Sequence, residues 1–192
     1  GRKGMPDELR SQMPILKELL TLLGYTIVEK EGFEADDILG TLSAQCKGDD
    51  KCFVATGDRD SLQLVSDNTC VLLAATKMGK AVTVVYDKEK LKEEYGVEPG
   101  GMIEIKALMG DSSDNIPGVA GIGEKTALQL IAKFGSVDGV YENLASPEIK
   151  PGARAKLEAG REMAYMSQKL AKISREAPIC TDIDCYRKEE GD

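Results

Sequence analysis

The sequence predicts an α/β fold in which a parallel or mixed sheet is flanked by helices and an α-helical cluster is appended. Two observations predict this class. Segments rich in β-forming residues alternate with helical segments up to about residue 98, and helical patterns follow from there onward. In addition, 42% of the 192 residues are apolar, so the chain can bury a sizeable core as a globular domain with room for a smaller subdomain.

The first half contains the predicted sheet. Apolar residues recur at helical spacing from Met13 to Leu23, and Gly24 ends this helix. Short β-rich segments predict strands at residues 25–29, 51–56, 70–74 and 82–86. Helices are predicted at residues 35–46, at residues 60–64 and from the capping residue Asp87 toward Tyr95.

The second half is predicted to be helical. Helices are expected at residues 99–109, 127–134, 136–144 and 153–173, with a loop at residues 147–152. We therefore divide the chain into an α/β core at residues 1–98, a helical subdomain at residues 99–175 and a C-terminal tail or linker at residues 176–192.

A glycine-rich segment stands between the first two of these later helices. Gly118, Gly121 and Gly123 allow tight turns and a close approach of backbone N–H groups to a large anion. Lys125 and Thr126 then open a helix whose N-terminus favours phosphate. This pattern predicts a helix-hairpin-helix that binds a nucleic-acid backbone.

Seven carboxylates occur in three short groups that follow three successive elements: Glu34, Asp36 and Asp37; Asp58 and Asp60; Asp111 and Asp114. Acids this close to a phosphate-binding turn would repel DNA unless divalent cations lay between them. Oxygen ligands without histidine are what magnesium or manganese prefers. Together the groups predict a two-metal site, in which the ions activate water and stabilise in-line displacement at phosphorus.

Each acidic group also has a purely structural explanation. Acids at a helix start complement the helix dipole, and for Glu34 to Asp37 taken alone this is the better explanation. Asp60 could be an N-cap completed by Gln63, which would leave Asp58 without a structural role. Asp114 could form an Asx-turn.

Charge and composition limit the function. A net charge of −8 and a pI near 4.8 argue against a surface that attracts DNA everywhere, so specific cationic strips must contact phosphate. The basic residues after the hairpin mostly suggest a solvated helix face, with Lys125 the exception. No apolar run approaches the roughly 20 residues of a membrane span, and five cysteines without histidine suggest neither a disulfide framework nor zinc. We expect a soluble, cytoplasmic protein.

Four segments carry a resemblance to a known family. They are Glu34-Ala35-Asp36-Asp37, Thr56-Gly57-Asp58-Arg59-Asp60, the run from Ala107 to Val119, and Gly121-Ile122-Gly123-Glu124-Lys125-Thr126-Ala127. In order and spacing they resemble the 5′-nuclease (flap endonuclease-like) family, and most closely the 5′→3′ exonuclease domains at the N-terminus of bacterial DNA polymerases I. The resemblance runs from about Met5 to Ile173. It implies a PIN-like central sheet with an appended helix-three-turn-helix subdomain.

The resemblance also implies a function for this chain. It implies a monomer in the bacterial cytosol that cleaves DNA at a 5′ flap, nick or 5′ end and that is continued by a covalently attached polymerase domain. Two Mg²⁺ (or Mn²⁺) ions would be held by the seven carboxylates, with Asp58, Asp60 and the basic Arg2 as catalytic residues. Gly118, Gly121, Gly123, Lys125 and Thr126 would contact DNA, with K⁺ at the hairpin carbonyls.

The sequence departs from the family at its start. Family members begin with a strand that carries an aspartate, and a second aspartate lies before the arch; both are expected to precede Gly1. Without them we expect weakened metal binding and low activity. Two alternatives therefore remain open: a non-catalytic, structure-specific DNA-binding module, and a PIN-type ribonuclease, which would not explain the hairpin.

Overall fold

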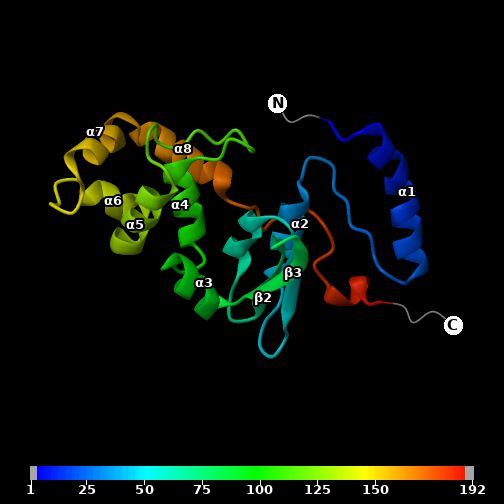
Figure 1. Ribbon diagram of the computed structural model, residues 1–192. Coiled ribbons are helices and arrows are strands. Elements are labelled where there is room, and N and C mark those ends of the chain that lie inside the picture. Colours follow the sequence, from blue (N-terminus) through cyan, green and yellow to red (C-terminus); the bar gives the residue numbers. More distant parts are fainter. Residues whose placement is uncertain (1–3, 189–192) are drawn as a thin grey trace. The chain divides into compact units, whose positions relative to one another are not determined.

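The computed structural model describes residues 4–188 (Figure 1). These residues form two compact parts. One consists of residues 4–45 and 174–188, and the other runs from Cys46 to Ile173. None of the described helices is both long and apolar enough to cross a membrane.

The first part contains helices α1 (Asp7–Leu22) and α2 (Ala35–Ser43). The predicted helix ending near Gly24 is confirmed, and α2 is shorter than expected. The strand predicted at residues 25–29 is wrong. This segment pairs with no strand among the described residues, and Tyr25 is 51% exposed. High β-propensity does not form a strand where no ladder partner completes its hydrogen bonds.

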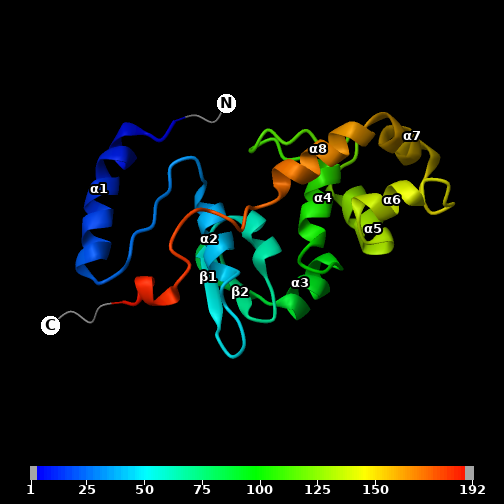
Figure 2. The same ribbon diagram turned by 180° about the vertical axis from the view of Figure 1, so that it is seen from behind.

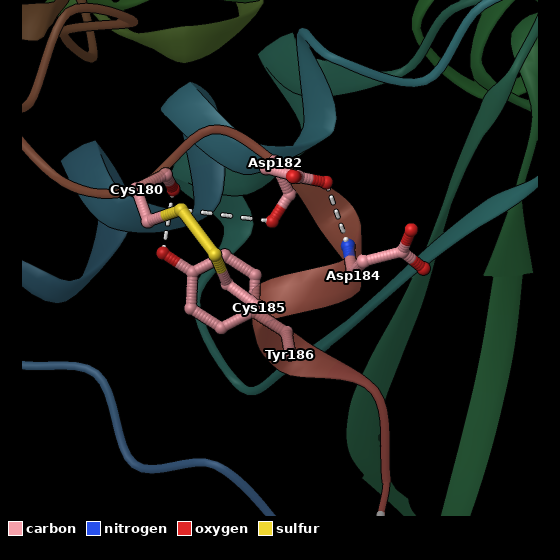
Figure 3. The surroundings of a disulfide bond; sticks show 5 residues. All are labelled: Cys180, Asp182, Asp184, Cys185 and Tyr186. Atoms are coloured by element: carbon pink, nitrogen blue, oxygen red, sulfur yellow. Dashed lines mark hydrogen bonds between the residues drawn. A yellow bond between two sulfur atoms is a disulfide. The ribbon is translucent and has the colours of Figure 1, made fainter.

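The C-terminal tail contains local structure. It contains the 3₁₀ helix η2 (Ile183–Tyr186), whose N-cap Asp182 accepts a hydrogen bond of 3.0 Å from the Asp184 amide. Cys180 and Cys185 form a disulfide beside it (Figure 3). The expectation that cysteine composition indicates no disulfide is therefore wrong at this position. An odd cysteine count conceals a local pair when the other cysteines are free, as Cys46, Cys52 and Cys70 are.

The second part begins with a mixed sheet of strands β1 (Cys52–Thr56), β2 (Thr69–Lys77) and β3 (Lys80–Tyr86), in the order β1-β2-β3. Strands β1 and β2 are parallel, with Cys52 opposite Thr69, and β2 and β3 are antiparallel. Met78 and Gly79 join β2 to β3 with φ values of 52° and 75°, as a tight hairpin turn requires. The last three predicted strands are thus confirmed.

The 3₁₀ helix η1 (Arg59–Leu64) follows β1 and contributes to the core of this part. Leu62 and Leu64 are buried, as are Val54, Val71 and Leu73 of the neighbouring strands. Because β1 ends at Thr56 and η1 begins at Arg59, the start of η1 lies beside the carboxyl end of β1, which is where an α/β sheet commonly binds ligands.

Six helices follow: α3 (Lys88–Tyr95), α4 (Gly101–Met109), α5 (Glu124–Phe134), α6 (Val137–Glu142), α7 (Pro151–Ala159) and α8 (Arg161–Ala171). Helix α4 packs against α5 and α8, and Figure 2 shows this group from behind. The single helix predicted at residues 153–173 is wrong, because it is divided at Gly160. A Cβ atom at Gly160 would lie 2.8 Å from Val119 Cγ1, so the absence of a side chain at this position leaves room for the hairpin loop.

Candidate functional site

Three carboxylates meet where η1 faces the end of α4. Asp60 comes from η1, and Asp111 and Asp114 come from the loop that follows Gly110. One oxygen atom from each of the three lies within 4.8 Å of the other two. The structure therefore brings together two of the three acidic groups found in the sequence.

Lys106, on the last turn of α4, lies at the centre of this cluster. Its Nζ atom is 2.9 Å from Asp111 Oδ2 and 2.9 Å from Asp114 Oδ2, and it also forms an ion pair with Asp60. The Lys106 side chain is only 8% exposed, whereas each carboxylate is about a quarter exposed. Three carboxylates and one ammonium leave a net charge of −2 when all are ionised.

Sequence analysis missed Lys106. The available signal was a lysine between the apolar residues Ile105 and Ala107 in a predicted helix, five positions before Asp111. A basic residue that interrupts an apolar segment needs a buried partner, and the acids of the next loop are within reach. Asp60, Lys106 and Asp111 line a cavity of about 150 Å³, whose lining also includes the apolar residues Met102 and Leu128.

The loop after α4 is held rigidly. Asp111 and Ile116 exchange two backbone hydrogen bonds of 2.8 Å, and Asn115 between them has a φ of 56°. The Asp111 carboxylate also accepts a hydrogen bond of 2.8 Å from the Ser113 amide. The Asp111 carboxylate is thus fixed by a bond from its own loop, and the Asx-turn suggested for Asp114 stays a prediction.

These contacts change the pKa values of Asp111, Asp60 and Lys106. Burial raises the pKa of Asp111, but the hydrogen bonds from Ser113 and Lys106 outweigh it and lower that pKa to about 2. Burial raises the pKa of Asp60 despite its contact with Lys106, and the neighbouring Asp58 and Asp114 add to this effect. For Lys106, burial lowers the pKa, and the three carboxylates outweigh it and raise that pKa above its usual range.

Asp58 has a structural role that the sequence did not reveal. It is the N-cap of η1, and its Oδ1 atom accepts a hydrogen bond of 3.0 Å from the Asp60 amide. The N-cap of η1 is therefore Asp58, whereas the sequence suggested Asp60. The Gln63 side chain donates a hydrogen bond to the Ala171 carbonyl and accepts one from the Ile173 N–H, each of 3.0 Å, and so links η1 to the end of α8.

The remaining predicted ligands lie in the other part. Asp37 accepts a hydrogen bond of 3.1 Å from the Glu34 amide in a capping box, and another of 2.8 Å from the Ser174 amide. Its carboxylate therefore stabilises the start of α2, and Asp36 is half-buried beside it. A role for Glu34, Asp36 and Asp37 as metal ligands stays a prediction. Arg2 lies outside the described residues.

The glycine segment forms a hairpin between α4 and α5. Gly118, with a φ of 61°, is buried, and its amide donates to Ser167 Oγ at 2.9 Å, so this glycine anchors the loop. Gly121 has a φ of 78° and is exposed, and its carbonyl accepts a hydrogen bond of 3.0 Å from Lys156 Nζ. Gly123 is the N-cap of α5, and Lys125 is exposed in the first turn.

This geometry suits an anion. The first-turn N–H groups of a helix have no intrahelical acceptor, and the dipole adds positive potential there. Other basic residues after the hairpin have internal partners. Lys133 pairs with Glu148 at 2.8 Å, Arg154 donates to the Ser146 carbonyl at 2.9 Å, and the Arg161 guanidinium lies 5.1 Å from the centre of the Tyr141 ring. These contacts favour a structural role for Lys133, Arg154 and Arg161 over a role in binding DNA.

The cluster residues fit a divalent cation. The candidate ligands are carboxylates, which suit hard cations such as Mg²⁺ and Mn²⁺. They are partly exposed, and the loop bonds described above orient Asp111 toward Asp60 and Asp114. Asp60, Asp111 and Asp114 are thus the residues of this part that could hold a metal ion.

Two family models together match the whole chain. Residues 1–96 match a 5′-3′ exonuclease N-terminal resolvase-like domain, and residues 97–192 match a 5′-3′ exonuclease C-terminal SAM fold.

Curated relatives are DNA polymerases I. The one from Caldicellulosiruptor bescii is 44% identical over 191 residues, which are 99% of this chain and 22% of the relative. The thermostable one from Thermus filiformis is 41% identical over 194 residues, with 100% and 22% covered. The chain spans about a fifth of the length of these relatives.

Solved structures have the same fold. The 5′-exonuclease of T5 with bound zinc matches with a TM-score of 0.69 and 26% identity, over 88% of this chain and 62% of that chain. A pseudo-enzyme-product complex of the bacteriophage T5 flap endonuclease with DNA and metal ions gives 0.68 and 26%, over 90% and 62%. These matches confirm the predicted fold class, a sheet flanked by helices with an appended helical domain. The chain belongs to the 5′-3′ exonuclease family.

Proposed function

We propose that this chain is the nuclease part of a structure-specific 5′→3′ exonuclease and 5′-flap endonuclease that hydrolyses DNA phosphodiesters with two divalent metal ions, Mg²⁺ or Mn²⁺. One observation carries the proposal. A single segment, residues 110–126, places two clustered carboxylates at one end and an exposed glycine turn at the other. Carboxylates can hold the metal ions that activate water, and the turn before a helix N-terminus can bind the phosphate backbone.

In this proposal the chain supplies the ligands and their orientation. Asp60, Asp111 and Asp114 hold metal, and Glu34, Asp36, Asp37 and Asp58 are proposed as further ligands. Bound divalent ions would lower the pKa of water and stabilise charge on the reacting phosphate. Ser113 fixes the Asp111 carboxylate through its amide, and Lys106 holds the three carboxylates at one point.

The hairpin binds DNA in this proposal. The N–H groups of Gly121 and Gly123, the Lys125 ammonium and the Thr126 region would contact the phosphate backbone without reading sequence. A K⁺ ion at the hairpin carbonyls is part of the proposal. Gly118 is assigned to anchoring the hairpin, because its amide already donates to Ser167. The proposed substrates are duplexes with a 5′ flap, nick or 5′ end, bound by a monomer that a polymerase domain follows.

Cleavage of a labelled 5′-flap duplex tests this function. It is measured in Mg²⁺, in Mn²⁺ and in EDTA, with both the 192-residue chain and the natural full-length protein. We expect Asp111→Asn to lose at least about 100-fold in cleavage by the full-length protein while binding is kept, because a metal ligand is removed. Asp49→Asn, at an exposed loop position, is the matched control.

Two results would overturn the proposal. If the full-length protein binds flaps but releases no 5′ fragment with either metal, the chain is a DNA-binding module without catalysis. The buried ammonium that already pairs with the clustered acids is the observation that favours this second candidate. If single-stranded RNA is cut and flap DNA is not, the ribonuclease alternative holds.

A further inference from the structure

We propose that the ammonium group of Lys106 holds the carboxylates of Asp60, Asp111 and Asp114 together before a divalent ion binds. The ammonium group then competes with that ion for the same carboxylate oxygens. The inference rests on the metal site of the proposed function. It makes Lys106 a positioning residue that sets the affinity of the site for metal.

The position of Lys106 argues against direct contact with DNA. An ammonium group has three N–H donors, and three carboxylates are in contact with this one. Its side chain is almost fully buried, in contrast to the exposed Lys125 of the hairpin. Lys106 therefore has its donors occupied by protein carboxylates and little surface to offer to a phosphate.

The contacts of Lys106 join separate segments of the chain. Asp60 is 46 positions away in η1, whereas Asp114 is 8 positions away in the loop after α4. Carboxylates that converge from two segments repel one another unless a positive charge lies between them. The ammonium supplies that charge, so the ligand geometry can exist without metal.

The same contacts impose a cost on metal binding. A divalent ion that enters the cluster must share or displace the hydrogen bonds of the ammonium, and it also meets a like charge a few ångströms away. Removal of the positive charge should therefore have two opposite effects. The metal-free protein becomes less stable, because three carboxylates face one another, and the divalent ion binds more tightly.

A lysine that only supports the fold would behave differently. Its loss would disorder the loop at Asp111 and Asp114, so that both stability and metal affinity would fall together. Tighter metal binding in a less stable protein is therefore the signature of competition.

The experiment uses Lys106→Met, which keeps length and removes charge, and Lys106→Arg, which keeps charge. Mn²⁺ binding is measured by calorimetry, and thermal unfolding is measured in EDTA and over a range of MnCl₂ concentrations. We expect Lys106→Met to lower the unfolding temperature in EDTA, to bind Mn²⁺ at least about tenfold more tightly than wild type and to show a larger rise in unfolding temperature with Mn²⁺. Lys106→Arg should stay close to wild type in affinity.

Lys88→Met is the matched control, because Lys88 pairs at 2.7 Å with the exposed Asp67 in the same part and should change neither property of the metal site. If Lys106→Met does not fold in EDTA, the double variant Asp60→Asn with Lys106→Met keeps the net charge of the cluster at −2. Competition predicts that it binds Mn²⁺ at least as tightly as wild type.

The outcomes separate this inference from the proposed function. If wild type binds Mn²⁺ and the variants without the ammonium bind it equally or more weakly, Lys106 is not a competitor, and the proposed metal site survives. If neither wild type nor any variant binds Mn²⁺, both the inference and the two-metal proposal fail.

Discussion

The buried side chain of Tyr141 is expected to make the stability of the helical region depend on pH. Its hydroxyl donates a hydrogen bond of 3.0 Å to the Leu157 carbonyl, which joins α6 to α7. Burial, and to a lesser degree the neighbouring Tyr165, raises the pKa of Tyr141 to about 12. The folded state therefore favours the neutral phenol more strongly than the unfolded state does.

The stability of the fold is therefore expected to fall at high pH. A pKa raised on folding contributes stability that is complete below about pH 10, the ordinary tyrosine value, and is lost as the pH rises toward 12. We expect the free energy of unfolding to fall by up to about 2 kcal/mol more in wild type than in Tyr141→Phe over this range. Urea unfolding at pH 9 and pH 11.5 measures the difference. Tyr25→Phe, at an exposed position, is the control, and an equal loss in Tyr141→Phe would contradict the assignment.

At the scale of elements, α7 supports the hairpin through Lys156. The Lys156 ammonium bonds the Gly121 carbonyl at 3.0 Å, and a Cβ atom at Gly121 would lie 2.9 Å from that Nζ atom. The lysine therefore packs directly on the turn that is proposed to contact DNA. It acts on the turn, whereas Lys125 is proposed to act on the phosphate.

Salt dependence distinguishes these two lysines. We expect Lys125→Met to weaken flap binding and to reduce the slope of log affinity against log salt concentration by about 1, because one phosphate contact is lost. Lys156→Met should weaken binding several-fold with little change in slope. Fluorescence anisotropy from low to high salt measures both, with Lys77→Met of the β2–β3 hairpin as control. A unit change of slope in Lys156→Met would instead make Lys156 a phosphate contact.

The elements that the sequence predicted well are those with a strong local signal. Periodicity and caps located most helices, and the residues before the Met78-Gly79 turn read clearly as a strand. The failures depend on contacts distant in sequence. A partner strand decides whether residues 25–29 pair, and the close approach of Val119 leaves no room for a side chain at Gly160, where the predicted long helix is divided.

The candidate site was predictable to a similar extent. Carboxylate spacing identified Asp60, Asp111 and Asp114, which the structure brings together. A lysine inside an apolar helical segment was a signal for Lys106 and the acids of the following loop, but the sequence could not show that Asp60 joins them, since this requires the packing of α4 against η1. Nor could it show that Gly118 anchors the hairpin, because its partner Ser167 lies 49 positions away.

At the scale of the whole molecule, the proposed function requires a chain with a net charge of −8 to bind a polyanion. Divalent ions should therefore affect DNA binding as well as cleavage. We expect Ca²⁺, in place of Mg²⁺, to tighten binding of the 5′-flap duplex by at least about fivefold relative to EDTA at constant ionic strength, because it neutralises the clustered acids. Anisotropy measures the affinities.

The control for this effect removes the acids. A variant with Asp60→Asn and Asp111→Asn should bind in EDTA more tightly than wild type and respond much less to Ca²⁺. A response of the same size in this variant would place the effect of the ion elsewhere on the molecule.

The contact between Gly110 and Gly118 has a further consequence. A Cβ atom at Gly118 would lie 2.2 Å from the Gly110 amide nitrogen, and one at Gly110 would lie 2.7 Å from the Ile116 carbonyl oxygen. The two backbones therefore close the intervening peptide into a compact ring whose neck tolerates no side chain. A graft of residues 111–117 from a homologue would therefore have to retain both neck glycines, together with the acids that pair with Lys106.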